Sequence, residues 1–99
     1  MDVIKERVSI RKYKAQPVEK SLIDEVIEAG IYAPTGRNDQ STRIIAVTDR
    51  EMRDRISKAN ADIMGTSGDP FYGAPVILVV LANKTVPTYV YDGSLVLGN

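Results

Sequence analysis

The stretch from Pro75 to Ala82 reads Pro-Val-Ile-Leu-Val-Val-Leu-Ala, an apolar run in which polar and apolar residues do not alternate. A run of this length and composition is typical of a β-strand that is covered on both faces. A second strand is predicted from Arg43 to Thr48, around the largely β-branched segment 44–47. Because a pair of strands leaves two unpaired edges, we expect further chain or a partner subunit to complete the sheet.

Helical patterns surround these two strands. The clearest helix is predicted from about Glu19 to Ala33, where apolar residues share one face and charged residues lie mostly opposite. A short helix is predicted over Asp2 to Val8, and the pattern at 88–98 begins another. The segment 62–73 contains three glycines and a proline, which favours a loop.

A third helix is predicted between the two strands. Thr48 and Glu51 have the spacing of a capping box at its start, and the helix is expected to end near Asn60. Its inner face is predicted to consist of Met52, Ile56 and Ala59. Near the start of the last helix, two tyrosines and an aspartate resemble an acid pair beside a cofactor, but they are interpreted as packing and capping residues: Tyr89, Tyr91 and Asp92.

Composition narrows the classes of function. The 99 residues include 13 basic and 13 acidic side chains, so no net charge attracts nucleic acid or an anionic membrane surface. The longest apolar run is too short to cross a bilayer, and the chain starts with a charged segment rather than an apolar signal core. We therefore expect a cytoplasmic protein that contacts neither nucleic acid nor membrane.

The chain contains no cysteine and no histidine. This composition excludes disulfides, zinc sites built on thiolates, and acid–base chemistry by imidazole. Carboxylate-only metal sites remain open, but no residue spacing of that kind is present. If the chain carries out redox chemistry, a bound organic cofactor has to supply it.

The loop from Ala33 to Gln40 is neither helix nor strand. Pro34 ends the preceding helical pattern, and Gly36 is expected to adopt a backbone shape that is closed to other residues. Thr35 and Asn38 offer side-chain donors and acceptors, so the loop could turn several polar groups, including backbone N–H groups, toward a planar ligand. An ordinary connection between a helix and a strand is the alternative interpretation.

A second polar cluster lies near the start of the chain. In an extended segment the side chains of Arg7, Ser9 and Arg11 point the same way, which places two guanidinium groups around a hydroxyl. Arginine and serine bind phosphate oxygens well. The alternative is a solvated basic patch that pairs with Glu6 or Glu19. No glycine-rich phosphate loop is present, so side chains would have to hold any phosphate.

Taken in order, these segments resemble the nitroreductase family of FMN-dependent oxidoreductases. The motifs are Arg-x-Ser-x-Arg-Lys-Tyr at 7–13, Ala-Pro-Thr-Gly-x-Asn-x-Gln at 33–40 and Phe-Tyr-Gly-Ala-Pro at 71–75. Each motif alone is weak, whereas the ordered set is specific and spans essentially the whole chain. The family pattern has proline and an aromatic residue where Ser41 and Thr42 stand here, so we expect this chain to pack its loop differently.

The resemblance implies an α+β fold, a mixed α/β sandwich, that works as a homodimer with FMN at the subunit interface. Arg7 and Ser9 would hold the FMN phosphate, and Arg11 would reach the phosphate or the flavin, while the 33–40 loop would line the flavin of the other subunit. The full set of implied FMN-binding residues is Arg7, Val8, Ser9, Arg11, Pro34, Thr35, Gly36, Asn38 and Asn60. No catalytic side chain and no metal are implied.

The implied activity is electron transfer from NAD(P)H through FMN to a small acceptor such as a nitroaromatic or a quinone. The chain ends at Asn99 inside what resembles the central helix of the family, so residues 1–99 are expected to form one partial domain, truncated in that helix. The alternative is a catalytically silent fragment that acts at most as a dimerising or flavin-binding module.

Overall fold

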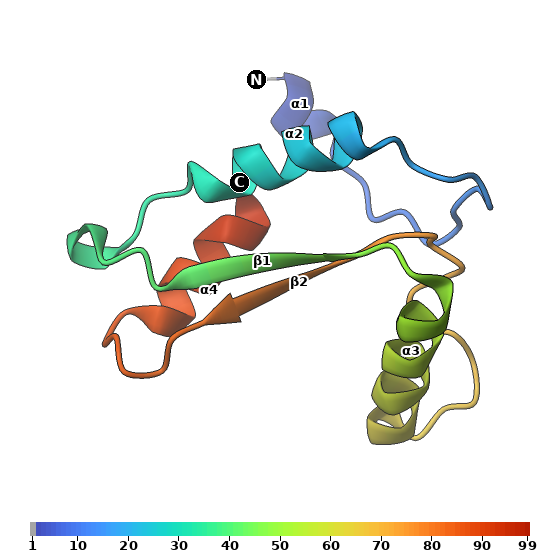
Figure 1. Cartoon of the computed structure of the whole chain (residues 1–99). Helices are drawn as coiled ribbons and strands as arrows, with labels where there is room; N and C mark the ends of the chain where they lie inside the picture. The colour runs from blue at the N-terminus through green and yellow to red at the C-terminus, as the bar shows by residue number, and fades with distance from the viewer. Residues whose placement is uncertain (1) are drawn as a thin grey trace.

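The structure, a computed structural model, describes residues 2–99 and is drawn in Figure 1. Helices and strands are mixed along the chain, which confirms the predicted α+β class. Among the described residues, no helix has both the length and the apolar character needed to span a membrane. In chain order the elements are α1 (Asp2–Glu6), α2 (Lys20–Ile31), the 3₁₀-helix η1 (Gly36–Asn38), β1 (Thr42–Val47), α3 (Arg50–Met64), β2 (Ile77–Ala82) and α4 (Tyr89–Gly98).

Strands β1 and β2 form an antiparallel ribbon whose register runs from Thr42 opposite Ala82 to Val47 opposite Ile77. Both strands lie where the apolar runs predicted them, within a residue or two. The second strand begins at Ile77 rather than at Pro75. Proline has no N–H to donate to a strand ladder, which explains why pairing starts after it.

Helices α2 and α4 pack against each other and against the same ribbon (Figure 1). They approach closely at Gly30, where an added Cβ would lie 2.9 Å from Ile44 Cδ1 and 3.3 Å from Val96 Cγ1. Glycine therefore allows α2, β1 and α4 to meet at one point. The buried apolar side chains of this layer include Ile23 and Val96.

The opposite face of the ribbon is partly open. Ile45 is 47% exposed and Leu81 is 48% exposed, although Val47 and Ile77 at the other end of that face are buried. The prediction that the second strand is covered on both faces is thus wrong for the described residues. The reason is that α2 and α4 pack on one side of the ribbon, so the other side receives no helix.

The first helix is shorter than predicted. It ends at Glu6, whereas the sequence pattern continued it to Val8. None of its residues is buried, and the apolar side chains of Val3 and Ile4 remain exposed. A five-residue helix without a packing surface has little to stabilise a second turn, because most helical stability comes from tertiary contacts.

Helix α3 begins and ends later than predicted. Its N-cap is Asp49, whose carboxylate accepts a hydrogen bond from the Met52 N–H at 2.9 Å. The prediction of a Thr48–Glu51 capping box is therefore wrong. The helix continues past Asn60 to Met64, and Gly65 ends it with a left-handed φ of 74°. The Asp49 carboxylate caps the first turn and so sets the start of the helix. Gly65 adopts a left-handed φ without strain and so sets its end.

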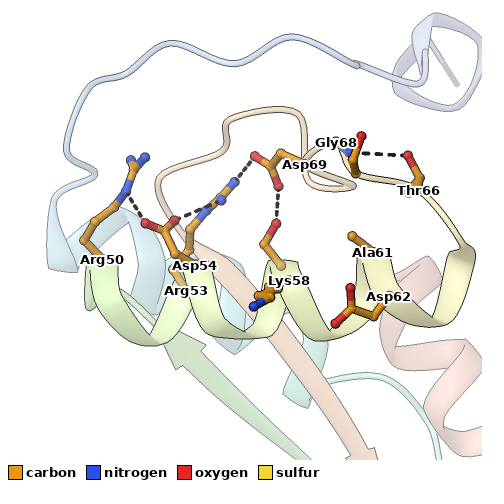
Figure 2. A pocket seen from close by; sticks show the side chains of 11 residues that line it. Arg50, Arg53, Asp54, Lys58, Ala61, Asp62, Thr66, Gly68 and Asp69 are labelled. Carbon is orange, nitrogen blue, oxygen red and sulfur yellow. Dashed lines mark hydrogen bonds and ion pairs between the residues drawn. The ribbon is translucent and has the colours of Figure 1, made fainter.

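The inner face of α3 is polar, which corrects the predicted face of Met52, Ile56 and Ala59. Its buried residues are Arg53, Ser57 and Ala61. Asp69, in the loop that returns from α3, accepts from the Arg53 guanidinium at 2.5 Å and from the Ser57 hydroxyl at 2.7 Å (Figure 2). Arg53 also donates to the Ala74 carbonyl at 2.8 Å and lies over the Phe71 ring.

Asp69 accepts two further hydrogen bonds from backbone N–H groups, those of Phe71 and Gly73. The hydrogen bond from Arg53 is the main reason that the pKa of Asp69 lies well below its usual range. We call Arg53, Ser57 and Asp69 the α3 latch. Because the latch uses directional polar contacts, it fixes the 65–73 loop along α3 beside a hollow of about 510 Å³.

We expect Asp69→Asn to lower the free energy of unfolding by about 1.5–3 kcal/mol, the cost of losing hydrogen bonds to a charged group. Denaturant unfolding followed by circular dichroism measures this change. Asp54→Asn is the matched control, because Asp54 also pairs with Arg53 but its side chain is 51% exposed. It should cost at most about 1 kcal/mol. Equal losses in the two variants would contradict the latch.

Candidate functional site

The 33–40 loop, which holds four of the predicted FMN-binding residues, joins α2 to β1. It contains the short helix η1, and its left-handed residues are Arg37, Asn38 and Gln40, with φ of 55°, 56° and 50°. Gly36 is not among the residues with positive φ. The expectation that Gly36 supplies an unusual backbone shape is therefore wrong, and its neighbours carry that strain instead.

Gly36 is needed for space. An added Cβ would lie 2.5 Å from the side chain of Thr88, the residue that precedes α4. This close approach brings the Gly36 N–H to the carboxylate of Asp92, to which it donates at 2.9 Å. The loop is therefore attached to the first turn of α4, across 56 residues of sequence.

Asp92 is 1% exposed, less than any of the buried hydrophobic residues. Besides the Gly36 N–H, its carboxylate accepts from the Ser41 hydroxyl at 2.7 Å and from the Thr88 hydroxyl at 3.0 Å. The Ser41 hydrogen bond is the main reason that the pKa of Asp92 is lowered, and the Gly36 N–H adds to it. These donors favour the charged form although burial opposes it.

A hollow of about 570 Å³ opens beside the loop, within the range of small-molecule sites. Three of the predicted flavin-lining residues, Pro34, Thr35 and Asn38, contribute to its wall. Arg43 supplies the cationic group in that wall and donates to the Thr42 carbonyl at 2.9 Å. The remaining lining residues are mostly apolar: Ile27, Ile31, Tyr32, Ala33, Gln40, Thr42 and Ile44.

Most backbone donors of the loop are used inside the protein. The Gly36 N–H binds Asp92, and the Gln40 N–H donates to Thr35 Oγ1 at 3.1 Å. The N–H groups of Asn38 and Asp39 bind carbonyls within the same turn. The expectation that several loop N–H groups face a ligand is therefore corrected. The side chains of Asn38 and Arg43 are among the polar groups of a wall that also holds apolar side chains, a combination that suits a flat ring with polar edges.

The second predicted cluster, formed by Arg7, Val8, Ser9 and Arg11, lies in a segment without regular structure, and all four residues are exposed. Within residues 2–99, no ion pair joins either arginine to Glu6 or Glu19, so the alternative of a paired basic patch gains no support. The two guanidinium groups are accessible to a ligand.

In the sequence, α2 separates the two clusters: residues 7–11 precede the helix and the 33–40 loop follows it. The 12 residues of this helix span roughly 18 Å. Asn60 belongs to neither cluster, because it is half-buried within α3, which Figure 1 shows apart from the 33–40 loop. The chain therefore brings Pro34, Thr35, Gly36 and Asn38 together but does not join them to the N-terminal cluster or to Asn60.

Sequence reasoning missed two residues of this region, Arg43 and Asp92. Arg43 was predicted only as the start of a strand, and nothing in its local pattern indicates that it lines a hollow. Asp92 was interpreted as a capping or packing residue. One signal was available: an aspartate in an otherwise mostly apolar helix, four residues after Thr88, is unusual enough to require hydrogen-bond partners.

Solved structures share this fold. A nitroreductase with bound FMN from Desulfitobacterium hafniense has a TM-score of 0.83 and 29% identity, over 98% of this chain and 59% of that one. An FMN-dependent nitroreductase from Clostridium difficile has a TM-score of 0.81 and 30% identity, over 95% of this chain and 53% of that one. The fold is therefore that of nitroreductases, over somewhat more than half of their length.

A family model described as the nitroreductase family matches residues 4–76. The chain belongs to the nitroreductase family, which confirms the resemblance drawn from its motifs. A Bacillus subtilis protein named FMN reductase (NAD(P)H) is 36% identical over 76 residues, which is 76% of this chain and 28% of that protein. The chain spans half or less of the length of the curated relatives it matches.

Gly36→Ala should destabilise the chain by about 1–3 kcal/mol, because its Cβ would overlap Thr88. The matched background is Thr88→Gly, which removes every atom that the new Cβ would meet most closely. Denaturant unfolding of the four proteins gives the coupling between the two positions. If Gly36→Ala costs as much in the Thr88→Gly background as in the wild type, the close approach is not what requires glycine.

The lowered pKa values of Asp69 and Asp92 predict an acid-dependent stability. In the unfolded chain these groups take up protons near pH 4, before the folded chain does, so the unfolded state binds more protons there. The stabilisation from these two groups should be complete and independent of pH above about pH 5, and the free energy of unfolding should fall as the pH drops through 4. Urea unfolding between pH 3 and pH 6 measures the slope, which should be shallower in Asp92→Asn. An unchanged slope would contradict the assignment.

Proposed function

We propose that the chain is an FMN-binding oxidoreductase of the nitroreductase type, which works as a homodimer with FMN at the subunit interface. The observation that carries the proposal is the hollow of about 570 Å³ that the Pro34–Asn38 loop forms beside α2 and β1. Its wall combines apolar side chains, such as Ile27 and Ile44, with polar groups, such as Asn38 and Arg43, which can meet the flat face and the polar edge of a flavin ring. Family membership and the FMN named in similar structures support the same cofactor.

The arrangement of the two clusters supports a dimeric site. Arg7, Ser9 and Arg11 precede α2 in the chain, the 33–40 loop follows it, and none of these three residues lines the hollow beside that loop. Because α2 separates the clusters within one chain, a single ligand can contact both most simply if each cluster comes from a different chain of a dimer. The exposed apolar side chains on the open face of the ribbon, Ile45 and Leu81, are suited to burial in such an assembly.

Each part of the chain would have a separate role. The guanidinium groups of Arg7 and Arg11 and the hydroxyl of Ser9 would hold the phosphate, with Val8 beside them, because charged forks and hydroxyls match phosphate oxygens. Asn38 would donate to the polar edge of the ring. Pro34, Thr35 and Gly36 would form the wall against its flat face, and Asn60 of a completed assembly is the remaining proposed contact.

FMN, when bound, supplies the chemistry: it accepts a hydride from NAD(P)H and passes electrons to a small acceptor such as a nitroaromatic or a quinone. The protein then needs no imidazole or thiol, in agreement with a chain that has neither. Arg43 would stabilise negative charge that develops on the ring, because its guanidinium lines the same hollow. The residues of the chain would bind and orient the FMN and exclude water from the face of its ring.

The test is titration of the purified chain with FMN, followed by flavin fluorescence and visible absorbance, with the molecular mass measured by light scattering. Arg7→Ala should weaken FMN binding by about 1.5–3 kcal/mol, the scale of a charged hydrogen bond. Lys12→Ala is the control. It also removes one positive charge, but in an extended segment the Lys12 side chain points away from the side shared by Arg7, Ser9 and Arg11. It should change affinity by less than about 1 kcal/mol.

Three outcomes separate the alternatives. Bound FMN on a dimer, with NAD(P)H oxidation, supports the full proposal. Bound FMN without oxidation leaves a flavin-binding module. A chain that ignores FMN contradicts the proposal and leaves at most a dimerising fragment. Equal effects of Arg7→Ala and Lys12→Ala would show that only general charge is involved and would remove Arg7 from the site.

A further inference from the structure

We infer that Asp92 is the positioning residue of the candidate site. From the first turn of α4 it holds the 33–40 loop, together with the adjoining Ser41, in the shape that lines the hollow. The functional part of this inference rests on the proposed FMN binding. Asp92 itself does not line the hollow, and it touches the loop through Gly36 and Ser41. Its effect on a ligand would therefore be transmitted through those two contacts.

The geometry assigns this role to Asp92 because its two carboxylate oxygens bind two different points of the connection between α2 and β1. Oδ1 accepts from the Gly36 N–H at 2.9 Å, at the start of η1 in the middle of the loop, and Oδ2 accepts from the Ser41 hydroxyl at 2.7 Å, just before β1. Thr88 donates to the same Oδ2 at 3.0 Å. One side chain thus sets the separation of the middle of the loop from the start of β1.

The loop needs such an external constraint. Three of its residues, Arg37, Asn38 and Gln40, have positive φ, which non-glycine residues adopt only at a cost and keep only where surrounding contacts fix them. The loop's own hydrogen bonds are short-range, as between the Asn38 N–H and the Thr35 carbonyl. The long-range bonds are those to Asp92 and the bond from the Asn83 N–H to the Ser41 carbonyl at 2.8 Å. Of these, the Asp92 bond to Gly36 reaches the middle of the loop, so it is the contact that selects this shape over other turns.

Burial explains why a carboxylate performs this role. A charged group that is 1% exposed is stable only with full hydrogen bonding, and here three donors converge on it. Movement of the loop would remove two of these three donors and leave the buried negative charge with the Thr88 hydroxyl alone, so the penalty for movement is steep. A neutral or smaller side chain would tolerate a looser loop. Ser41 stands where the motif pattern of the family has proline, which has no hydroxyl to donate.

The α3 latch provides a matched control. Asp69 is likewise a carboxylate with a lowered pKa that accepts hydroxyl, backbone and guanidinium donors and fixes a loop, but its loop is 65–73 (Figure 2). Its contacts lie on α3, apart from the 33–40 loop. Variants of Asp69 and Asp92 therefore make equivalent changes at two sites, of which only one borders the hollow.

The experiment is amide hydrogen exchange of the purified full chain, read by mass spectrometry for wild type, Asp92→Ala, Asp92→Asn and Asp69→Ala. We expect Asp92→Ala to speed exchange at residues 35–41 about tenfold or more, with little change at 66–73, and Asp69→Ala to do the reverse. Asp92→Asn retains one acceptor oxygen and should give an intermediate rate. This partial rescue is not expected of a merely space-filling residue.

The same proteins are then titrated with FMN. Asp92→Ala should raise the Kd for FMN about tenfold or more, and Asp69→Ala should change it less than about twofold, although both variants lose stability. Exchange that rises uniformly along the chain in Asp92→Ala, or not at all at 35–41, would overturn the inference. So would equal losses of FMN affinity in the two variants.

If Asp92→Ala does not fold, Asp92→Asn and Ser41→Ala carry the test, because each removes only part of the network. Ser41→Ala should speed exchange at 39–41 more than at 66–73, and a uniform change would again overturn the inference. A wild-type chain that does not bind FMN would refute the proposed function. In that case the exchange pattern alone still decides whether Asp92 positions the loop.

Discussion

The hydrogen bonds that converge on the Asp92 carboxylate join parts of the chain that no local interaction would bring together. Gly36 lies in the middle of the 33–40 loop, Ser41 lies just before β1, and Thr88 precedes α4. The Ser41 carbonyl also accepts from the Asn83 N–H at 2.8 Å, which ties the end of β2 to the same point. The start of one strand, the end of the other, the loop and α4 therefore depend on one buried charge. The apolar layer between α2, β1 and α4 supplies stability, and the Asp92 contacts supply the geometry of the loop.

Much of the fold could be predicted from the sequence, because α2, β1 and β2 are encoded by the spacing of their apolar residues. The departures have physical causes that a local pattern does not contain. The role of Gly36 depends on Thr88, a neighbour 52 positions along the chain (88 minus 36), and only the folded structure shows that contact. The polar inner face of α3 depends on Asp69 in the returning loop, and apolar periodicity cannot indicate a face that is buried by an ion pair.

The candidate site likewise has features that the local sequence pattern predicts and features that depend on distant residues. The pattern at 33–40 predicted which residues gather at the end of α2, and Pro34, Thr35 and Asn38 do line one hollow. It did not predict that the loop's N–H groups are largely used within the protein, because that follows from the left-handed residues and from Asp92. The N-terminal arginines are exposed and do not line this hollow, which sequence alone could not show. The separation of the two clusters within one chain is what the structure adds.

The polar attachment of α3 affects how the chain responds to fluctuations. Directional bonds from Arg53 and Ser57 join this helix to its own returning loop, whereas α3 makes few contacts with the other helices and strands. An apolar layer loses its contacts gradually as it loosens, whereas a network of this kind opens when a single geometry is lost. We therefore regard α3 and its returning loop as a cooperative unit that can detach while the ribbon and its two helices stay folded. In such a molecule, partial unfolding would begin at α3 and would displace Asn60, while the 33–40 loop would stay attached to α4.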